Sequence, residues 1–215
     1  CSSDLGLLAV GGDLSLDRLL EAYRCGIFPW YNPGEQILWW SLDPRFVLFP
    51  DELKVSKSMR PYFNQHKLQV TIDTQFKKVM TLCQNQDRKH QYGSWINDEM
   101  IEAYSELHKL GYAHSVEVWD GDQLVGGLYG LSMGKMFFGE SMFSLVPNAS
   151  KFGFISLVRK LKKLGFNLID CQQETPHLAS LGARGISRNE FMQKIGANSM
   201  EEDLVGNWGE LLKEE

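Results

Sequence analysis

Three apolar segments in the middle of the chain constrain the fold more than any other feature. They span residues 113–119, 124–131 and 135–143, and short turns that contain glycine separate them. Turns of this kind join antiparallel neighbours, so the run predicts a three-stranded meander. Glycines at positions 126, 127 and 130 of the middle segment predict a bulge there, or the close approach of another chain segment or of a ligand.

One carboxylate interrupts the third apolar segment. Glu140 lies among phenylalanine and methionine side chains, where an unpaired charge is costly. A second apolar stretch, residues 166–172, ends with Asp170 and Gln172 on either side of a cysteine. We therefore expect adjacent strands that deliver these polar groups to one cleft.

Further helices and strands are predicted on both sides of the meander from apolar periodicity and capping residues. Helices are expected at 16–25, 76–83, 98–110, 150–164, 176–182 and 188–195, and strands at 46–49, 68–73 and 166–171. This order is typical of an α+β architecture, a mixed sheet with helices on its faces. It also resembles the order of the acetyltransferase (GNAT) fold.

The best boundary signal is Asp43-Pro44, since the residue before a proline is pushed towards extended geometry. We expect a small N-terminal α+β domain at residues 1–44, rich in loops and aromatic side chains. A GNAT-like catalytic domain is expected at residues 45–215, and its acidic tail is expected to be a solvated end.

Composition excludes several classes of protein. A hydrophobic content of 43% and a charged content of 23% are those of a soluble globular protein. No stretch approaches the roughly 18 apolar residues of a membrane helix, so we expect a cytoplasmic protein. The net charge of −5 argues against nonspecific coating of nucleic acid, because that affinity comes from neutralised phosphates. Four irregularly spaced cysteines predict reduced thiols rather than a disulfide framework or a metal site.

Short motifs occur in order along nearly the whole chain. They read GLLAVGGDL at 6–14, GIFPW at 26–30, LWWSLDPR at 38–45, HSVEVW at 114–119, GESMFS at 139–144, NASK at 148–151, DCQ at 170–172 and ASLG at 179–182. In this combination they resemble the leucyl/phenylalanyl-tRNA protein transferases. The resemblance implies transfer of Leu or Phe, and less readily Met, from aminoacyl-tRNA to the α-amino group of proteins with N-terminal Arg or Lys. The product would carry an N-degron for protein degradation, and no cofactor or metal is implied.

The resemblance also implies a catalytic set of Glu140, Asp170 and Gln172. A glutamine side chain cannot take a proton at neutral pH, so Gln172 is expected to orient the amine or the ester. Asp170 is the expected proton acceptor or part of a relay, and Glu140 would complete an acidic pocket for the cationic N-terminus. Which carboxylate takes the proton is left open. No strong base is needed, because the donor is an activated ester and positioning contributes up to about 7–11 kcal/mol.

Other residues match the family by motif position. The hydrophobic pocket for the donor side chain would be formed by Leu128, Phe137, Met142, Phe154 and Leu157. Trp30 and Trp95 would stack on or flank the terminal adenosine. A tRNA phosphate patch along one helix would consist of Lys151, Arg159, Lys160, Lys162 and Lys163. Phe154 and Leu157 also have the spacing of plain helix core, and a lysine-rich helix face is often only solvated.

Three other functions are consistent with parts of the sequence. An acyl-CoA transferase would need a glycine-rich turn before its helix, whereas residues 145–151 contain Pro147 and no glycine. A binding module would capture basic N-termini or tRNA ends without chemistry. A cysteine hydrolase would use Cys171 and His177, for which no third orienting group is evident. We expect a monomer.

Overall fold

The computed structural model describes residues 6–65, 67–86 and 94–212. Within these residues the protein has an α+β architecture with one large mixed sheet and one small sheet. The large sheet has the order β10-β4-β9-β8-β7-β6-β5, and only β8 and β9 are parallel. Its strands are β4 (Arg45–Leu48), β5 (Gln69–Ile72), β6 (Ala113–Asp120), β7 (Gln123–Met133), β8 (Met136–Ser144), β9 (Leu168–Gln172) and β10 (Arg184–Ile186). The predicted meander is confirmed as β6, β7 and β8.

The predicted helices are confirmed, and the expected side-chain caps form at the start of two of them. The Asn97 side chain accepts a hydrogen bond from Met100 N at 2.8 Å, and Ser187 Oγ accepts one from Glu190 N at 3.1 Å. The α-helices are α1 (Leu16–Arg24), α2 (Arg60–Asn64), α3 (Phe76–Gln84), α4 (Asp98–Lys109), α5 (Ala149–Lys163), α6 (Pro176–Ser180), α7 (Arg188–Asn198) and α8 (Trp208–Leu211). Short 3-10 helices, Pro50–Glu52 and Lys57–Met59, precede α2.

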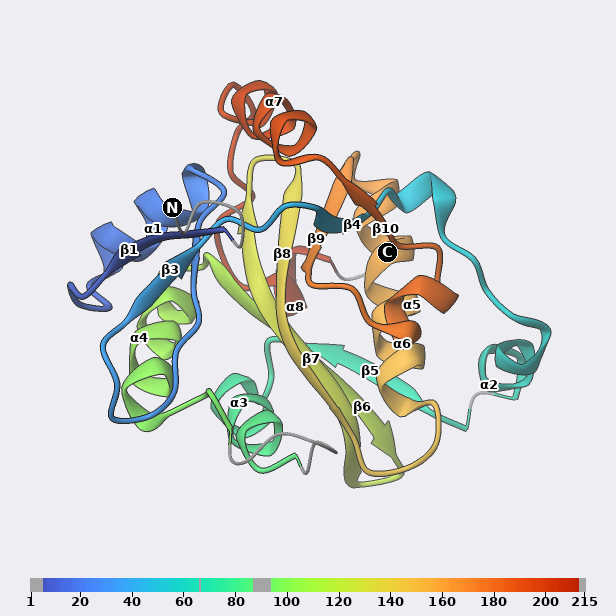
Figure 1. The fold of residues 1–215 in the computed structure, drawn as a ribbon. Coiled ribbons are helices and arrows are strands. Elements are labelled where there is room, and N and C mark those ends of the chain that lie inside the picture. The colour runs from blue at the N-terminus through green and yellow to red at the C-terminus, as the bar shows by residue number, and fades with distance from the viewer. Residues whose placement is uncertain (1–5, 66, 87–93, 213–215) are drawn as a thin grey trace.

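Helices cover the two faces of the large sheet and create two apolar cores. Helix α5 packs on one face of β6, β7 and β8, and α3 and α4 pack on the other (Figure 1). The core on the α3 and α4 side includes Tyr23 and Phe138, and the core under α5 includes Phe137 and Leu157. The meander therefore lies at the centre of the molecule, with a packed core on each side.

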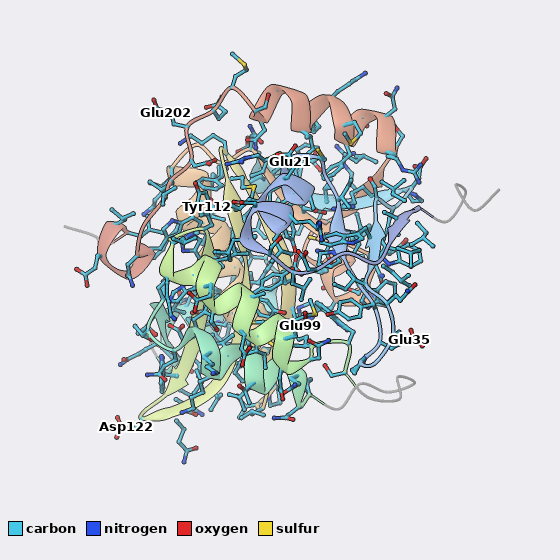
Figure 2. All side chains as sticks on the ribbon, turned by 90° about the vertical axis from the view of Figure 1, so that its left-hand side faces the viewer. Glu21, Glu35, Glu99, Tyr112, Asp122 and Glu202 are labelled. Carbon is cyan, nitrogen blue, oxygen red and sulfur yellow. The ribbon has the colours of Figure 1, made fainter. Side chains whose placement is uncertain are left out.

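The N-terminal part of the chain forms the small sheet, in the order β1-β3-β2. Its strands are β1 (Leu7–Val10), β2 (Phe28–Pro29) and β3 (Leu38–Trp40). Helix α1 lies over α4, as Figure 2 shows from that side, and the hydroxyls of Tyr23 and Tyr104 join the two helices at 2.5 Å. Because α1 and Val47 share one apolar core, the division into residues 1–44 and 45–215 stays a prediction.

Helix α5 lies close to the sheet at Gly126 of β7. A Cβ atom at Gly126 would lie 2.6 Å from the Cβ of Ala149, closer than side chains pack. We expect Gly126→Ala to lower the free energy of unfolding by about 1–3 kcal/mol. In Gly196→Ala, within α7, the new Cβ would meet nothing within 4 Å, so this variant is expected to be stabilised by about 0.5–1 kcal/mol. Urea denaturation of both variants measures the difference, and a Gly126→Ala variant as stable as the wild type would contradict this view of the packing.

The expectation of a solvated C-terminal tail is wrong at Trp208, although the acidic residues Glu201, Glu202 and Glu210 are exposed. Trp208 is fully buried, its backbone N donates to Asp73 Oδ2 at 2.7 Å, and its ring stacks on His114 with centroids 3.7 Å apart. An apolar indole and a buried carboxylate thus hold α8 against the sheet. Residues 213–215 lie outside the described range.

Candidate active site

A cavity opens where the two parallel strands part. The β8–β9 ladder runs from Met136 and Leu168 to Phe138 and Asp170 and ends there. Residues beyond that point on both strands line a cavity of about 460 Å³. The structure brings nearly all the predicted substrate-binding and catalytic residues to it: Trp30, Trp95, Leu128, Phe137, Glu140, Met142, Phe154, Asp170 and Gln172.

Leu157 is the exception among the predicted pocket residues. It is buried in the core under α5, and it does not belong to the described residues that line the cavity. Phe154 lies one helical turn earlier and does line it. Helical spacing alone therefore does not distinguish Phe154, which lines the cavity, from Leu157, which lies in the core.

A β-bulge places Glu140 at the cavity. In the register of β7 and β8, Tyr129 pairs with Ser141 and Gly130 pairs with Gly139, so Glu140 is the extra residue. A bulge re-aims side chains and reverses their alternation along the strand. Before it, Phe138 faces the core of α3 and α4; after it, Phe143 does so.

Glu140 is a buried carboxyl group with one free oxygen. It is 9% exposed, and its Oε1 accepts hydrogen bonds from the Tyr23 hydroxyl at 2.7 Å and from Gln172 Nε2 at 2.8 Å. Its Oε2 is buried without a hydrogen-bond partner. Burial raises the pKa of Glu140 to about 8, and the negative charge of Asp170 adds to the increase, although the bond from Tyr23 opposes it. A cation brought to Oε2 would favour the ionised form.

Asp170 is fully engaged by Arg45. Arg45 Nε and NH2 donate to Oδ1 and Oδ2 of Asp170 at 2.8 and 2.6 Å, and both side chains are 0% exposed. The guanidinium lies between the rings of Phe28 and Phe191, 4.6 Å from each centroid. Such a bidentate, stacked pair fixes the carboxylate in one orientation.

Gln172 connects the two carboxyl groups. Its backbone N donates to Asp170 Oδ1 at 2.9 Å, and its side chain donates to Glu140 Oε1. Its φ of 60° lies in the left-handed region, which is costly for a residue with a Cβ. A bulge at Cys171, where β9 pairs with β4, precedes it. Strained backbone and two bulges at one point are typical of functional sites.

Comparison with known proteins identifies the family. The family model "Leucyl/phenylalanyl-tRNA protein transferase" matches residues 47–196, and the model of that family's N-terminal domain matches residues 12–43. The chain belongs to the leucyl/phenylalanyl-tRNA protein transferase family. It is therefore an aminoacyltransferase.

Curated relatives cover most of the chain. A leucyl/phenylalanyl-tRNA–protein transferase of Syntrophus aciditrophicus (strain SB) is 59% identical over 203 residues, which are 94% of this chain and 85% of the relative. One of Pseudomonas fluorescens (strain Pf-5) is 61% identical over 186 residues, 86% of this chain and 82% of the relative. One of Christiangramia forsetii is 60% identical over 190 residues, 87% of this chain and 90% of the relative.

A solved structure, that of L-PGS from Bacillus licheniformis, is a weak match. Its TM-score is 0.44 at 12% sequence identity, over 84% of this chain and 61% of that chain. A likeness of this degree supports no conclusion about fold or function.

Two contacts in this candidate site, that of Tyr23 with Glu140 and that of Arg45 with Asp170, were not predicted from the sequence. Tyr23 and Tyr104 have the helical spacing of core aromatics, and Arg45 is separated from Asp170 by 125 residues. The motif LWWSLDPR contains Arg45 and contributes to the family resemblance, but nothing in it reveals a buried ion pair. A buried carboxylate needs a partner, and this requirement could have predicted an ion pair for Asp170.

The predicted phosphate residues lie along α5 and not in the cavity. Ser150 and Phe154 of α5 line the cavity, and Lys162 lies about 12 Å beyond Phe154 along the helix at 1.5 Å per residue. Some of these cations contact the protein itself. Lys162 pairs with Asp51 at 2.8 Å, and Arg159 lies 4.3 Å from the centre of the Phe63 ring.

The alternative chemistries find little support in this transferase site. Burial raises the pKa of the Cys171 thiol far above its usual range, so it is not a ready thiolate nucleophile. His177 Nε2 is buried without a hydrogen-bond partner. At the start of α5, Ser144 Oγ accepts the hydrogen bond of Ser150 N at 3.2 Å, which leaves fewer free amides for the pyrophosphate of an acyl-CoA.

Within the described ranges, no group of three or more His, Cys, Asp or Glu side chains is placed to hold a metal ion. None of the helices in the same part of the chain is long and apolar enough to cross a membrane. Of the described cysteines, Cys25, Cys83 and Cys171 form no disulfide bond.

Proposed function

We propose that this chain transfers Leu or Phe, and less readily Met, from aminoacyl-tRNA to the α-amino group of proteins with N-terminal Arg or Lys. One observation carries the proposal: Glu140 lines an apolar cavity, its Oε2 is buried without a hydrogen-bond partner, and its other oxygen is held by Tyr23 and Gln172. Such a site combines an apolar pocket for the donor side chain with an acceptor for a cation or a proton.

The donor amino acid occupies the apolar part of the cavity. Leu128, Phe137 and Phe154 are almost fully buried there, and Met142 is half-buried beside them. A pocket of this kind accepts apolar side chains such as those of Leu, Phe and Met and rejects charged ones, which would lose their water without compensation. Trp30 and Trp95 line the same cavity and flank the terminal adenosine.

The reaction is the aminolysis of an ester. The acceptor nitrogen attacks the carbonyl carbon and forms the C–N bond, and the C–O bond to the ribose breaks. The amine loses one proton and the leaving ribose oxygen gains one, so the reaction releases no net proton. Glu140 accepts the amine proton at Oε2, while the carboxamide of Gln172 orients the reacting groups. Because an α-amine has a pKa of about 8, a base with a pKa near 8 is matched to it.

Asp170 is the weaker candidate for the proton acceptor. Both of its oxygens already bind Arg45, and Oδ1 also accepts the backbone N–H of Gln172. Its role is to hold Gln172 in the left-handed conformation that points the side chain at Glu140. The sequence-based preference for Asp170 is therefore replaced by a proposal in which Asp170 positions and Glu140 accepts.

The remaining features of the proposal concern the surroundings of the site. Cations along α5, which extend from beside the cavity at Lys151 to about 12 Å beyond Phe154 at Lys162, contact tRNA phosphates and add affinity without base readout. The GNAT-like character of the catalytic domain rests on the parallel strands β8 and β9 and their divergence at the site. We place the reaction in the cytoplasm, where aminoacyl-tRNA is made, and we propose a monomer.

A transfer assay tests this function directly. The protein is incubated with labelled Phe-tRNA and a model protein that begins with Arg, and in parallel with the same protein after acetylation of that N-terminus. Label is expected only on the free N-terminus, because an acetylated nitrogen has no lone pair available for attack. Equal labelling of both proteins, or of neither, would contradict the proposal.

A further inference from the structure

An aromatic side chain extends the cavity rim beyond Trp30. Trp30 follows β2 and lines the cavity, whereas Trp40, the last residue of β3, is half-buried and outside it. The centroids of the two rings are 6.0 Å apart, and their planes are inclined by 57°. The two indoles are thus neighbours, with Trp30 at the cavity and Trp40 on the small sheet.

The position of Trp40 is fixed before any ligand binds. Its indole Nε1 donates to the backbone oxygen of Trp30 at 2.7 Å. Trp40 also pairs with Phe28 across the β2–β3 ladder, and Phe28 packs on the guanidinium of Arg45. A ring held in this way loses little conformational entropy when a flat ligand stacks on it.

We infer that Trp40 is a stacking platform for the nucleotide that precedes the terminal adenosine of the donor tRNA. The inference rests on the proposed function, in which the terminal adenosine lies against Trp30. The tRNA continues from that adenosine through a phosphodiester, so the next base must leave the cavity beside Trp30. Successive nucleotides of a stacked strand are spaced about 3.4 Å apart, which puts the next base within reach of a ring 6.0 Å from Trp30.

The surroundings of Trp40 favour a base over the acceptor protein. Across the small sheet its register partner on β1 is Leu7, and Leu38 lies on the same strand. These neighbours supply no carboxylate for an N-terminal Arg or Lys. Flat aromatic faces with apolar neighbours bind single-stranded bases of any identity, as a transferase that accepts several tRNAs requires.

Kinetics with two donors test the inference. One donor is full Phe-tRNA, and the other is phenylalanyl-adenosine, which lacks the preceding nucleotide. We expect Trp40→Ala to raise KM for Phe-tRNA about 5- to 150-fold, the range of one lost base stack, and to leave KM for phenylalanyl-adenosine unchanged. Trp40→Phe keeps a flat ring and is expected to retain KM for Phe-tRNA within about threefold. Trp30→Ala is expected to weaken both donors.

Trp119→Ala is the matched control. Trp119 is also half-buried at the end of a strand, and its Nε1 donates to Thr71 Oγ1 at 2.8 Å, but it does not line the cavity. This variant is expected to leave both KM values unchanged. If Trp40→Ala does not fold, Trp40→Leu keeps the apolar bulk without the flat ring and is expected to show the same selective loss.

Three outcomes would overturn the inference. They are an equal rise of KM for both donors in Trp40→Ala, an unchanged KM for Phe-tRNA, or a rise confined to KM for the acceptor protein, which would identify a protein-docking surface. A wild type that transfers from neither donor would contradict the proposed function instead. Binding of the trinucleotide CCA and of adenosine, measured by calorimetry, would then still decide the role of Trp40, because only CCA should bind more weakly to Trp40→Ala.

Discussion

Glu140→Gln is expected to lower kcat/KM by about 10²–10⁴-fold, the usual contribution of a general base. Glutamine has nearly the same shape and can still accept the hydrogen bonds that Tyr23 and Gln172 donate to Oε1. It cannot take a proton at the position of Oε2. Below pH 8, kcat/KM of the wild type should depend on two deprotonations, that of Glu140 and that of the α-amine. In the variant only the dependence on the amine should remain.

The same variant is expected to be more stable than the wild type at pH 8. The pKa of Glu140 is raised from 4.5 to about 8 in the folded protein, so between these values the folded state holds a proton that the unfolded state has lost. The wild type therefore loses about 1.4 kcal/mol of stability per pH unit between them, and loses no more above the folded pKa. Glu140→Gln removes this loss, so its advantage should be a few kcal/mol at pH 8 and should vanish near pH 4.5.

Urea denaturation at pH 5 and pH 8 measures the stability, and initial rates between pH 6 and 9 measure the activity. Glu202→Gln is a suitable control, because Glu202 is exposed on the surface (Figure 2), and neither quantity should change. A Glu140→Gln variant that keeps its activity, or whose stability relative to the wild type is independent of pH, would contradict the assignment of Glu140.

The second large effect is expected at the buried ion pair. Removing either partner, by Arg45→Met or Asp170→Leu, should lower the free energy of unfolding by about 3–5 kcal/mol, because the other charge is left buried and unpaired. The double variant replaces both charges with apolar groups and should recover much of that loss. All three variants should lose activity, because the backbone N–H of Gln172 loses an oriented acceptor.

Asp170→Asn separates positioning from proton transfer. We expect a lower kcat/KM with the pH dependence of the wild type, since Glu140 remains. Loss of a deprotonation from the pH profile would instead identify Asp170 as the proton acceptor. The exposed pair of Arg184 and Glu52, 2.9 Å apart, is the control for the stability measurement. Breaking it by Arg184→Met should cost less than about 1 kcal/mol.

Local signals account for the parts of the fold that the sequence predicts well. Asn97 and Ser187 cap their helices through their own side chains, and Gly111 follows the first of these helices in a left-handed conformation. Such signals lie within a few residues of the structure that they determine. Strands of two to four residues in the small sheet carry no comparable periodicity, and Pro29 lies within one of them.

Contacts between distant residues explain what the sequence could not predict of the site. Glu140, Asp170 and Gln172 were chosen as a set from the family motifs, and the structure brings them into one hydrogen-bonded cluster. Their division of labour depends on Arg45 and Tyr23, which reach the site from β4 and α1. Trp208 was missed for a related reason: its acidic neighbours suggested a solvated tail, while its burial depends on Asp73 and His114.

The bulge at Glu140 makes the length of this segment as important as its composition. On one side of the bulge Phe138 belongs to the core of α3 and α4, and on the other side Phe143 belongs to the same core, while Met142 faces α5. Deleting one residue between them would exchange the faces of Phe143 and Met142. Substitutions can therefore accumulate around Glu140 during evolution, whereas insertions and deletions there would exchange the residues of two cores at once.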